Sequence, residues 1–343
     1  MQYVRMLQPR VILTFRLIQF PIYGIQEDEQ SENDADLGGE SDTSSLRSSI
    51  LSYRRENGRT YHAYKDGSYV LPNDEMENQR LDLQHHLFSL TFDEVLNLAP
   101  LQKEPARVLD AGCGTGIWAI DFADEHPESQ IIGVDLSPIQ PPFAPPNVSF
   151  FVDDLEDVWT FSEKFDYVFA RFLTGSILDW PKFFAQSYES LSPGGIIELQ
   201  DIIYPMQCDD GSLDKNSAIY RWSELLLQSF TAIGRPLNSA LKYKEQLAEA
   251  GFVDIVEVQY KWPSNRWPKD PKYKKVGIWT YENAIGALSA LSLAVFTRPK
   301  GEGGQGWTVD ELEVLLDQVR KDFRNLNIHA YWPISVVYAK KPE

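Results

Sequence analysis

The sequence of this 343-residue chain predicts an α/β fold built on one mostly parallel sheet. Short apolar runs alternate with helical stretches from about residue 106 to residue 204, as parallel strands joined by crossover helices do. Several of these runs end in an acidic residue, which is typical of the ligand-binding edge of such a sheet. The expected parallel strands lie near residues 106–110, 130–134, 148–152, 165–170 and 195–203.

The stretch before this sheet is expected to divide into a tail and a helical segment. Residues 1–51 are expected to form a disordered or atypical acidic N-terminal region, and the Ser-rich part at 26–50 is expected to be disordered. Residues 1–25 carry three arginines and no acid, which fits either an organelle-targeting segment or an atypical start. The main domain is expected to span residues 52–343. Its first helices are expected at Glu75–Leu90, capped by Asn73 or Asp74, and at Phe92–Leu98.

The first strand leads into a glycine-rich loop, Asp110–Gly116, which a helix at Ile117–Glu125 follows. Three glycines at alternate positions allow a tight turn and let a ligand lie against bare main chain. A dinucleotide loop has the spacing G-x-G-x-x-G, but Ile117 stands here in place of the third glycine. A carboxylate at Asp110 would repel a pyrophosphate, whereas it suits an ammonium group. The loop therefore favours S-adenosylmethionine (SAM) over NAD.

Acidic residues also end the next two strands. Asp135 follows Ile131–Val134, at the place where an acid hydrogen-bonds ribose hydroxyls. Asp154 follows the third strand and, with the Leu155 amide, is expected to read adenine. An acid at Asp135 would serve NAD as well as SAM. The choice of cofactor therefore depends on the glycine loop and on the order in which the strand-end motifs follow one another along the sequence.

The second half of the chain is expected to complete the sheet and to build the acceptor site. A helix at Tyr243–Ala250 precedes strands at Phe252–Lys261 and Ser335–Lys340, which would pair antiparallel at one edge. Insertions at 205–242 and 262–325 follow sheet strands and should line the substrate pocket. Helices are expected near 274–296 and 309–325. The tryptophans of these insertions, Trp222, Trp262, Trp267, Trp279 and Trp307, fit either plain core or a planar aromatic substrate.

The remaining cofactor contacts are predicted from position. The main chain of Gly112, Gly114 and Gly116 is expected to pass under the methionine part of SAM, with Asp110 near the ammonium. The SAM carboxylate needs a cation, for which Arg80 and Arg171 are the two candidates.

The sequence displays no obvious catalytic group. Methyl transfer from a sulfonium mainly requires that donor and acceptor be aligned, and a base is needed only if the acceptor keeps its proton. Possible bases are His62, His85, His86 and Tyr204. We expect no specific base among them and leave the catalytic residues unassigned.

Composition restricts the partners. The net charge is −18, and eight acids without a base lie in Glu27–Asp42. Since Lys and Arg form no cluster, direct nucleic-acid binding is not expected. No apolar stretch is long enough to span a bilayer, so no membrane association is expected. Two cysteines cannot form a disulfide framework or a metal cluster alone, which suggests a cytoplasmic or nuclear location.

The motifs together resemble the class I SAM-dependent methyltransferases. The matching stretches are Asp110–Gly116, Gly133–Asp135, Val152–Asp154, Phe165–Val168 and Leu191–Gly195. A closer resemblance, over about residues 52–342, is to the fungal LaeA-like methyltransferases of secondary metabolism. It is carried by stretches that include Glu56–His62, Leu71–Glu75, Arg80–His85, Gly175–Pro181, Trp267–Pro271 and Ile328–Pro333. The resemblance implies a Rossmann-like, seven-stranded sheet of order 3-2-1-4-5-7-6 with SAM as cofactor.

Three hypotheses about function follow. One is methylation of O or N of a small aromatic metabolite, and another is a role as a LaeA-like regulator with protein partners. A third hypothesis is a SAM-binding interaction module with little or no turnover. An NAD-dependent dehydrogenase is the least favoured reading.

Overall fold

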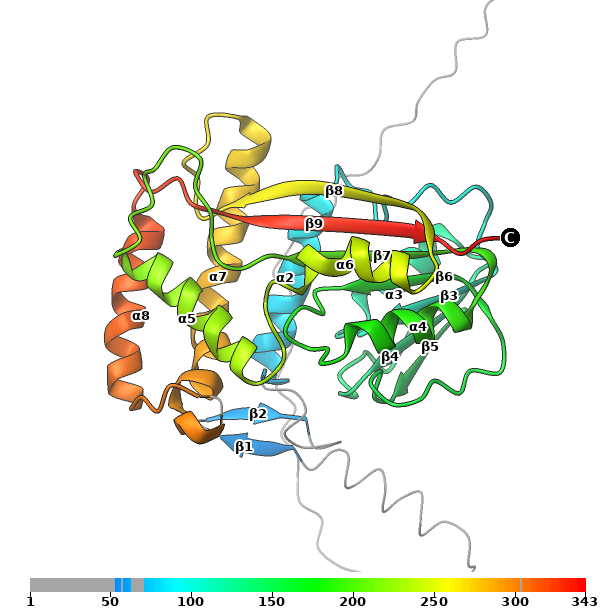
Figure 1. The fold of residues 1–343 in the computed structure, drawn as a ribbon, viewed down its shortest axis with the longest axis horizontal. Helices are drawn as coiled ribbons and strands as arrows, with labels where there is room; N and C mark the ends of the chain where they lie inside the picture. The colour runs from blue at the N-terminus through cyan, green and yellow to red at the C-terminus, as the bar shows by residue number, and fades with distance from the viewer. Residues whose placement is uncertain (1–52, 57, 63–70, 303) are drawn as a thin grey trace, which may run out of the picture. The chain divides into compact units, whose positions relative to one another are not determined.

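The computed structural model describes residues 53–56, 58–62, 71–302 and 304–343 (Figure 1). The expectations for residues 1–51 fall outside the described residues. No helix in the described ranges is both long and apolar enough to cross a membrane.

Seven strands form one sheet, whose order is β5-β4-β3-β6-β7-β9-β8. Their bounds are β3 Arg107–Ala111, β4 Gln130–Asp135, β5 Val148–Val152, β6 Phe165–Arg171, β7 Leu191–Ile202, β8 Val253–Pro263 and β9 Tyr331–Lys340. The first five are parallel to one another, and β9 pairs antiparallel with both β7 and β8. Counted within this sheet, the order is the predicted 3-2-1-4-5-7-6.

Helices cover both faces of the sheet because apolar residues of the central strands point alternately to either side. Val108 and Phe169 pack with α3 (Ile117–Glu125), where Trp118 stacks on Phe169 with ring centroids 3.7 Å apart. Leu109 and Val168 point the other way. That second face packs against α4 (Trp180–Ser190) and α6 (Tyr243–Glu249).

The remaining helices gather beside the sheet and share a second core (Figure 1). They are α2 (Glu75–Thr91), α5 (Ala218–Ala232), α7 (Pro271–Thr297) and α8 (Val309–Arg324). Helix α2 contacts both α7 and α3, so it joins this helical group to the sheet. Short 3₁₀ turns lie at Ser239–Lys242 and Lys300–Glu302, and a small hairpin pairs β1 (Arg54–Glu56) with β2 (Arg59–Tyr61).

Side-chain caps fix where these helices begin. Asp74 accepts a hydrogen bond from the Glu77 N–H at 3.1 Å, which makes Asp74 rather than Asn73 the cap of α2. Asp270 caps α7 in the same way, with a proline at the first helical position. Thr308 and Glu311 form a reciprocal capping box at the start of α8.

The helix predicted at Phe92–Leu98 is wrong. Asp93 and Glu94 adopt positive φ angles of 57° and 69°, so the chain leaves the helical path directly after α2. The N–H groups of Leu98 and Ala99 then donate to the Glu198 carboxylate on β7, at 2.7 to 3.0 Å. A long-range partner thus satisfies backbone groups that a helix would have paired locally.

Candidate functional site

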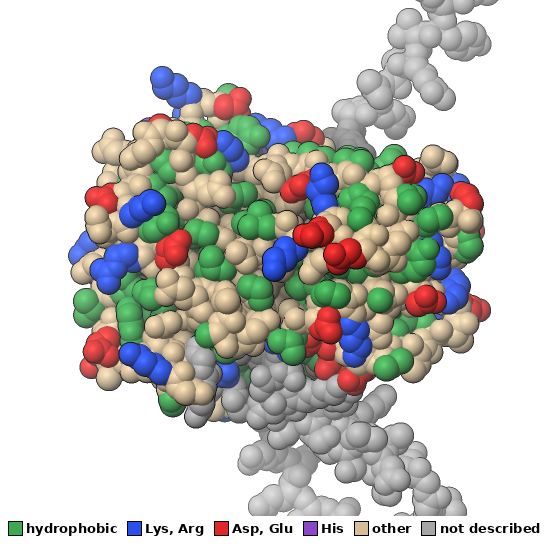
Figure 2. Space-filling view, in the orientation of Figure 1, with side chains coloured by type: hydrophobic (Ala, Val, Ile, Leu, Met, Phe, Trp, Pro, Cys, Tyr) green, Lys and Arg blue, Asp and Glu red, His purple; other side chains and the backbone are tan. Residues whose placement is uncertain are grey.

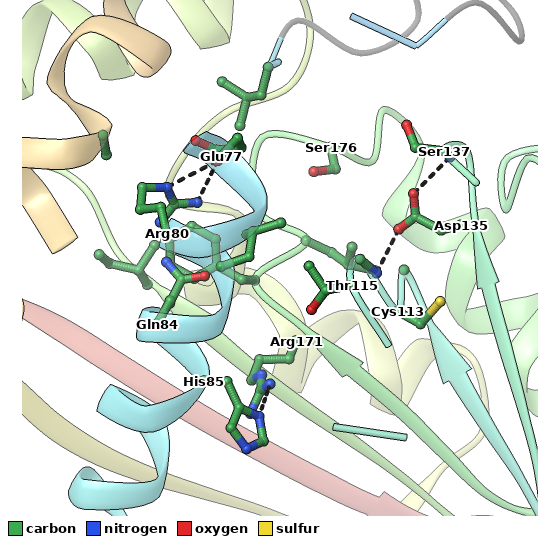
Figure 3. A pocket seen from close by; sticks show the side chains of 18 of the residues that line it. Glu77, Arg80, Gln84, His85, Cys113, Thr115, Asp135, Ser137, Arg171 and Ser176 are labelled. Atoms are coloured by element: carbon green, nitrogen blue, oxygen red, sulfur yellow. Dashed lines mark hydrogen bonds and ion pairs between the residues drawn. The ribbon is translucent and has the colours of Figure 1, made fainter. Parts of the chain in front are cut away.

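A pocket of about 170 Å³ lies at the carboxyl ends of β3, β4, β5 and β6 (Figure 3). Residues of α2 from Glu77 to His85 form one wall, and residues of α7 from Thr280 to Leu291 form another. The two walls come from segments about two hundred residues apart in the sequence. The pocket therefore continues from the strand ends into the helical group.

The glycine loop turns at the base of this pocket. Gly112, Gly114 and Gly116 have φ angles of +74°, +55° and +78°, in the region that favours glycine. A Cβ on Gly112 would meet Leu173 at 2.4 Å, and one on Gly116 would meet the Phe150 ring at 2.4 Å. Only Gly114 has open space, since its nearest neighbour would lie 3.7 Å away. Gly116 is not among the residues that line the pocket, and its lack of a Cβ makes room for the Phe150 ring; its predicted contact with the donor stays a prediction.

Asp135 holds the loop in place from the end of β4. Its two carboxylate oxygens accept the N–H of Gly114 at 2.8 Å and the N–H of Ser137 at 2.9 Å (Figure 3). Burial raises the pKa of this carboxyl group, while the backbone donors oppose that rise. Asp135 thus lines the pocket and also shapes the loop that carries Gly114, while its predicted contact with ribose stays a prediction.

Asp110 and Arg171 lie on adjacent strands and influence each other's charge. Asp110 is buried, and its Oδ2 has no hydrogen-bond partner among the described residues. Burial raises its pKa to about 7, although the Arg171 charge opposes the rise. Arg171 also lines the pocket, and desolvation lowers its pKa to about 10. Asp110 is one of the residues that line the pocket, and its buried oxygen without a partner among the described residues would suit a ligand that brings a positive donor.

Arg80 lines the pocket, and its guanidinium is hydrogen-bonded to Glu77 and to Asn283. Its Nε and Nη2 donate to Oε1 of Glu77 at 3.0 and 2.6 Å (Figure 3). Its Nη1 donates to Oδ1 of Asn283 on α7 at 2.7 Å. Arg80 therefore links the two helices that wall the pocket. The assignment of the SAM carboxylate to Arg80 or Arg171 stays a prediction.

The loop after β5 forms the far side of the pocket. Asp154 and Leu155 both line it, and Asp154 Oδ1 accepts the Glu156 N–H at 2.8 Å. Glu156 in turn accepts from Arg235 at 2.7 Å and from the Leu178 N–H at 2.6 Å. Sequence reasoning missed Glu156 and Arg235, whose contact spans 79 positions and leaves no local pattern.

Of the four candidate bases, His85 and Tyr204 line the pocket, whereas His62 and His86 do not. Both ring nitrogens of His85 are hydrogen-bonded, to Arg171 and to Asp121, each at 2.8 Å. His86 points its ring at Trp279, and neither His86 nor His62 lines the pocket. Tyr204 lines it, and burial raises the pKa of its hydroxyl. No histidine of the pocket wall thus keeps a ring nitrogen for an acceptor proton.

Three buried tryptophans wall the pocket on the side of the helical group. Trp222 and Trp262 belong to the predicted set, and Trp332 of β9 joins them. The indole N–H groups of Trp222 and Trp262 donate to Ser292 and Thr91 at 2.9 and 2.8 Å. Trp332 Nε1 has no partner among the described residues.

The other predicted tryptophans lie outside this wall. Trp267, Trp279 and Trp307 stack on or contact His329, His86 and Phe296. We define the acceptor chamber as the part of the pocket lined by Tyr204, Trp222, Trp262 and Trp332, together with the α7 wall.

Charge on the face of the molecule shown in Figure 2 is dispersed. Lys and Arg side chains are interspersed there with Asp and Glu. Among the described residues, His, Cys, Asp and Glu form no group that could hold a metal ion.

Comparison with known proteins identifies the relatives of this chain. A family model described as "Methyltransferase domain" matches residues 83–257, just over half of the chain. The chain is 40% identical to methyltransferase pytC of Aspergillus terreus, over 89% of this chain and 93% of that protein. It is 36% identical to probable methyltransferase tdiE of Emericella nidulans, over 78% and 83%. It is 37% identical to protein-methionine methyltransferase laeA of Emericella nidulans, over 84% and 77%.

Proposed function

Since this chain belongs to the SAM-dependent methyltransferases related to these fungal proteins, we propose that it methylates O or N of a small aromatic metabolite. The observation that supports this proposal is the continuity of the pocket. One end meets the strand termini that carry Asp110, Asp135 and Asp154, and the other end is the aromatic acceptor chamber. A donor and a flat acceptor could therefore meet within a single cavity.

The residues at the strand termini fit SAM. Asp110 has a buried oxygen that no described residue pairs and that would suit the ammonium, and Gly114 leaves space beside the main chain. Asp135 would bind the ribose, and Asp154 with the Leu155 amide would bind adenine. Arg80 and Arg171 are the candidate partners of the carboxylate. When bound, SAM supplies a methyl group on a positively charged sulfur.

The chain's own residues mainly align and desolvate the reactants. Tyr204 and the three chamber tryptophans are each at most 5% exposed, so they exclude water around the acceptor. The buried Trp332 N–H has no partner among the described residues, and an acceptor oxygen that reaches it would satisfy it. We assign no catalytic base, because both nitrogens of the pocket-lining His85 are already hydrogen-bonded.

A LaeA-like regulator is the second candidate. The observation that favours it is the 37% identity to laeA, close to the 40% identity to pytC. The two roles differ in what the acceptor chamber receives, a metabolite or a side chain of a protein partner. The domain assignment that we propose is the same for both: a methyltransferase domain at 52–343, with acceptor-side insertions at 205–242 and 262–325.

Metabolite profiling of a deletion strain tests the proposal. Restoring the wild-type gene should return one methyl group to one compound or to a closely related set. Restoring the Asp110→Ala variant should not. Loss of many unrelated pathways on deletion would support the regulator instead, and full rescue by Asp110→Ala would show that methylation does not require the Asp110 carboxylate.

A further inference from the structure

His85 of α2 lines the pocket and also contacts Asp121, a partly exposed residue of α3. Its side chain is almost fully buried, and both ring nitrogens are hydrogen-bonded. Nδ1 lies 2.8 Å from Nη2 of Arg171 at the end of β6. Nε2 lies 2.8 Å from Oδ2 of Asp121, which sits on α3 with its side chain 46% exposed. One imidazole therefore joins three elements.

The chemistry of these groups sets the direction of both hydrogen bonds. A guanidinium only donates, so Nδ1 of His85 must accept from Arg171. The imidazole proton then resides on Nε2 and is donated to Asp121. Burial lowers the pKa of His85, which favours this neutral form. The neighbours thus select a single tautomer, as an orienting carboxylate does for a histidine ligand.

Arg171 is held from further sides as well. Its guanidinium carbon lies 5.0 Å from the ring centroid of Phe88 and 5.9 Å from that of Phe169. Such contacts hold the planar cation against the ring faces without using its N–H donors. The positive charge acts on Asp110, whose Oδ2 has no partner among the described residues.

We propose that Asp121 and His85 are positioning residues that fix the Arg171 guanidinium beside Asp110, so that the amino-acid end of the methyl donor meets both charges in a set arrangement. This inference rests on the proposed donor site. Asp121 and His85 are not assigned contacts with the donor. They act through Arg171. Because Asp121 lies on α3, which directly follows the glycine loop, these hydrogen bonds also couple the Arg171 guanidinium to the loop that carries Gly114.

Two ligands distinguish positioning from general support of the fold. S-adenosylhomocysteine carries the amino-acid end, whereas 5′-methylthioadenosine has the same nucleoside without it. By calorimetry, Asp121→Ala should weaken binding of S-adenosylhomocysteine about 5- to 20-fold. It should leave the affinity for 5′-methylthioadenosine within about two-fold, because the ribose and adenine contacts lie elsewhere.

Two further variants provide the controls. Asp121→Asn retains an oxygen that accepts the His85 proton, so it should restore affinity for S-adenosylhomocysteine to within about three-fold of wild type. Asp124→Ala removes an exposed carboxylate from the same helix and should change neither affinity. Equal weakening of both ligands by Asp121→Ala, or equal losses in its Ala and Asn variants, would overturn the proposal.

The tautomer provides an independent readout. The chain contains five histidines, so their ring nitrogens can be followed by NMR after labelling, with His85 assigned from its loss in His85→Gln. We expect the wild-type His85 signal to show a protonated Nε2 and an unprotonated Nδ1. A mixture of tautomers in the wild-type protein would refute the proposed hydrogen bonds from Arg171 to His85 and from His85 to Asp121. Failure of the wild type to bind S-adenosylhomocysteine would instead remove the donor site on which the inference rests.

Discussion

Three alanine substitutions, two in the glycine loop and one outside it, can separate the effects of backbone conformation, side-chain packing and ligand contact. Gly114, Gly116 and Gly211 have similar positive φ angles of +55°, +78° and +76°. A Cβ on Gly211 would meet nothing within 4 Å, whereas one on Gly116 would lie 2.4 Å from the Phe150 ring. Gly114 lines the pocket and would have its nearest neighbour, Leu81, at 3.7 Å.

The expected losses in stability follow from these distances. A left-handed conformation costs a residue with a Cβ about 1–2 kcal/mol, so Gly211→Ala and Gly114→Ala should each lose about that much. Gly116→Ala adds the overpacking of a buried ring, which costs about 1–3 kcal/mol more. Its free energy of unfolding should therefore fall by about 2–5 kcal/mol.

Ligand binding should follow a different order. The Gly114 methyl group would stand in the pocket beside the N–H that Asp135 accepts, so Gly114→Ala should weaken binding of S-adenosylhomocysteine by about ten-fold or more. Gly211→Ala should bind as the wild type does. Urea unfolding measures the first quantity and calorimetry the second.

Two results would refute this reasoning. If Gly114→Ala bound S-adenosylhomocysteine normally, the loop would not contact the donor at that position. If Gly116→Ala were no less stable than Gly211→Ala, the packing against Phe150 would carry no cost.

Three further predictions concern single residues. Because the pKa of Asp110 is about 7 and its carboxylate should attract the donor ammonium, affinity for S-adenosylhomocysteine should fall about ten-fold from about pH 8 to about pH 6 by calorimetry. Asp110→Asn should remove this slope, and a persisting slope would exclude Asp110 as its origin. Trp332→Phe should weaken chroman-4-one binding, measured by fluorescence, about 2- to 10-fold while sparing chroman, which lacks the carbonyl; equal losses for both would argue against the indole N–H. Glu198→Gln should lower stability in urea by about 2–3 kcal/mol, since the carboxylate accepts the Leu98 and Ala99 N–H groups; an unchanged midpoint would contradict that role.

The sheet could be predicted from the sequence because its signals are local. Each parallel strand is a short apolar run, and the helix at Ile117–Glu125 begins and ends where the residues predict. The acids at 110, 135 and 154 meet at one edge because parallel strands share a direction. These features require no knowledge of distant contacts.

The features that the sequence did not reveal depend on distant partners. The stretch at Phe92–Leu98 is rich in helix-compatible residues, yet the N–H groups of Leu98 and Ala99 at its end donate to the Glu198 carboxylate on β7. Arg80 and Asn283 lie 203 positions apart, so nothing near Arg80 indicates that its guanidinium is already engaged. Trp332 reaches the acceptor chamber only because β9 enters the sheet between two earlier strands.

The position of β9 also constrains the order in which a ribosome-bound chain can mature. β9 is translated after all the other described elements, yet it lies inside the sheet and not at its border. Until it emerges, β7 and β8 lack their shared neighbour and expose unpaired edges, which are templates for aggregation. Premature termination before Tyr331 would therefore leave a chain with an incomplete sheet, and would also remove the Trp332 wall of the acceptor chamber.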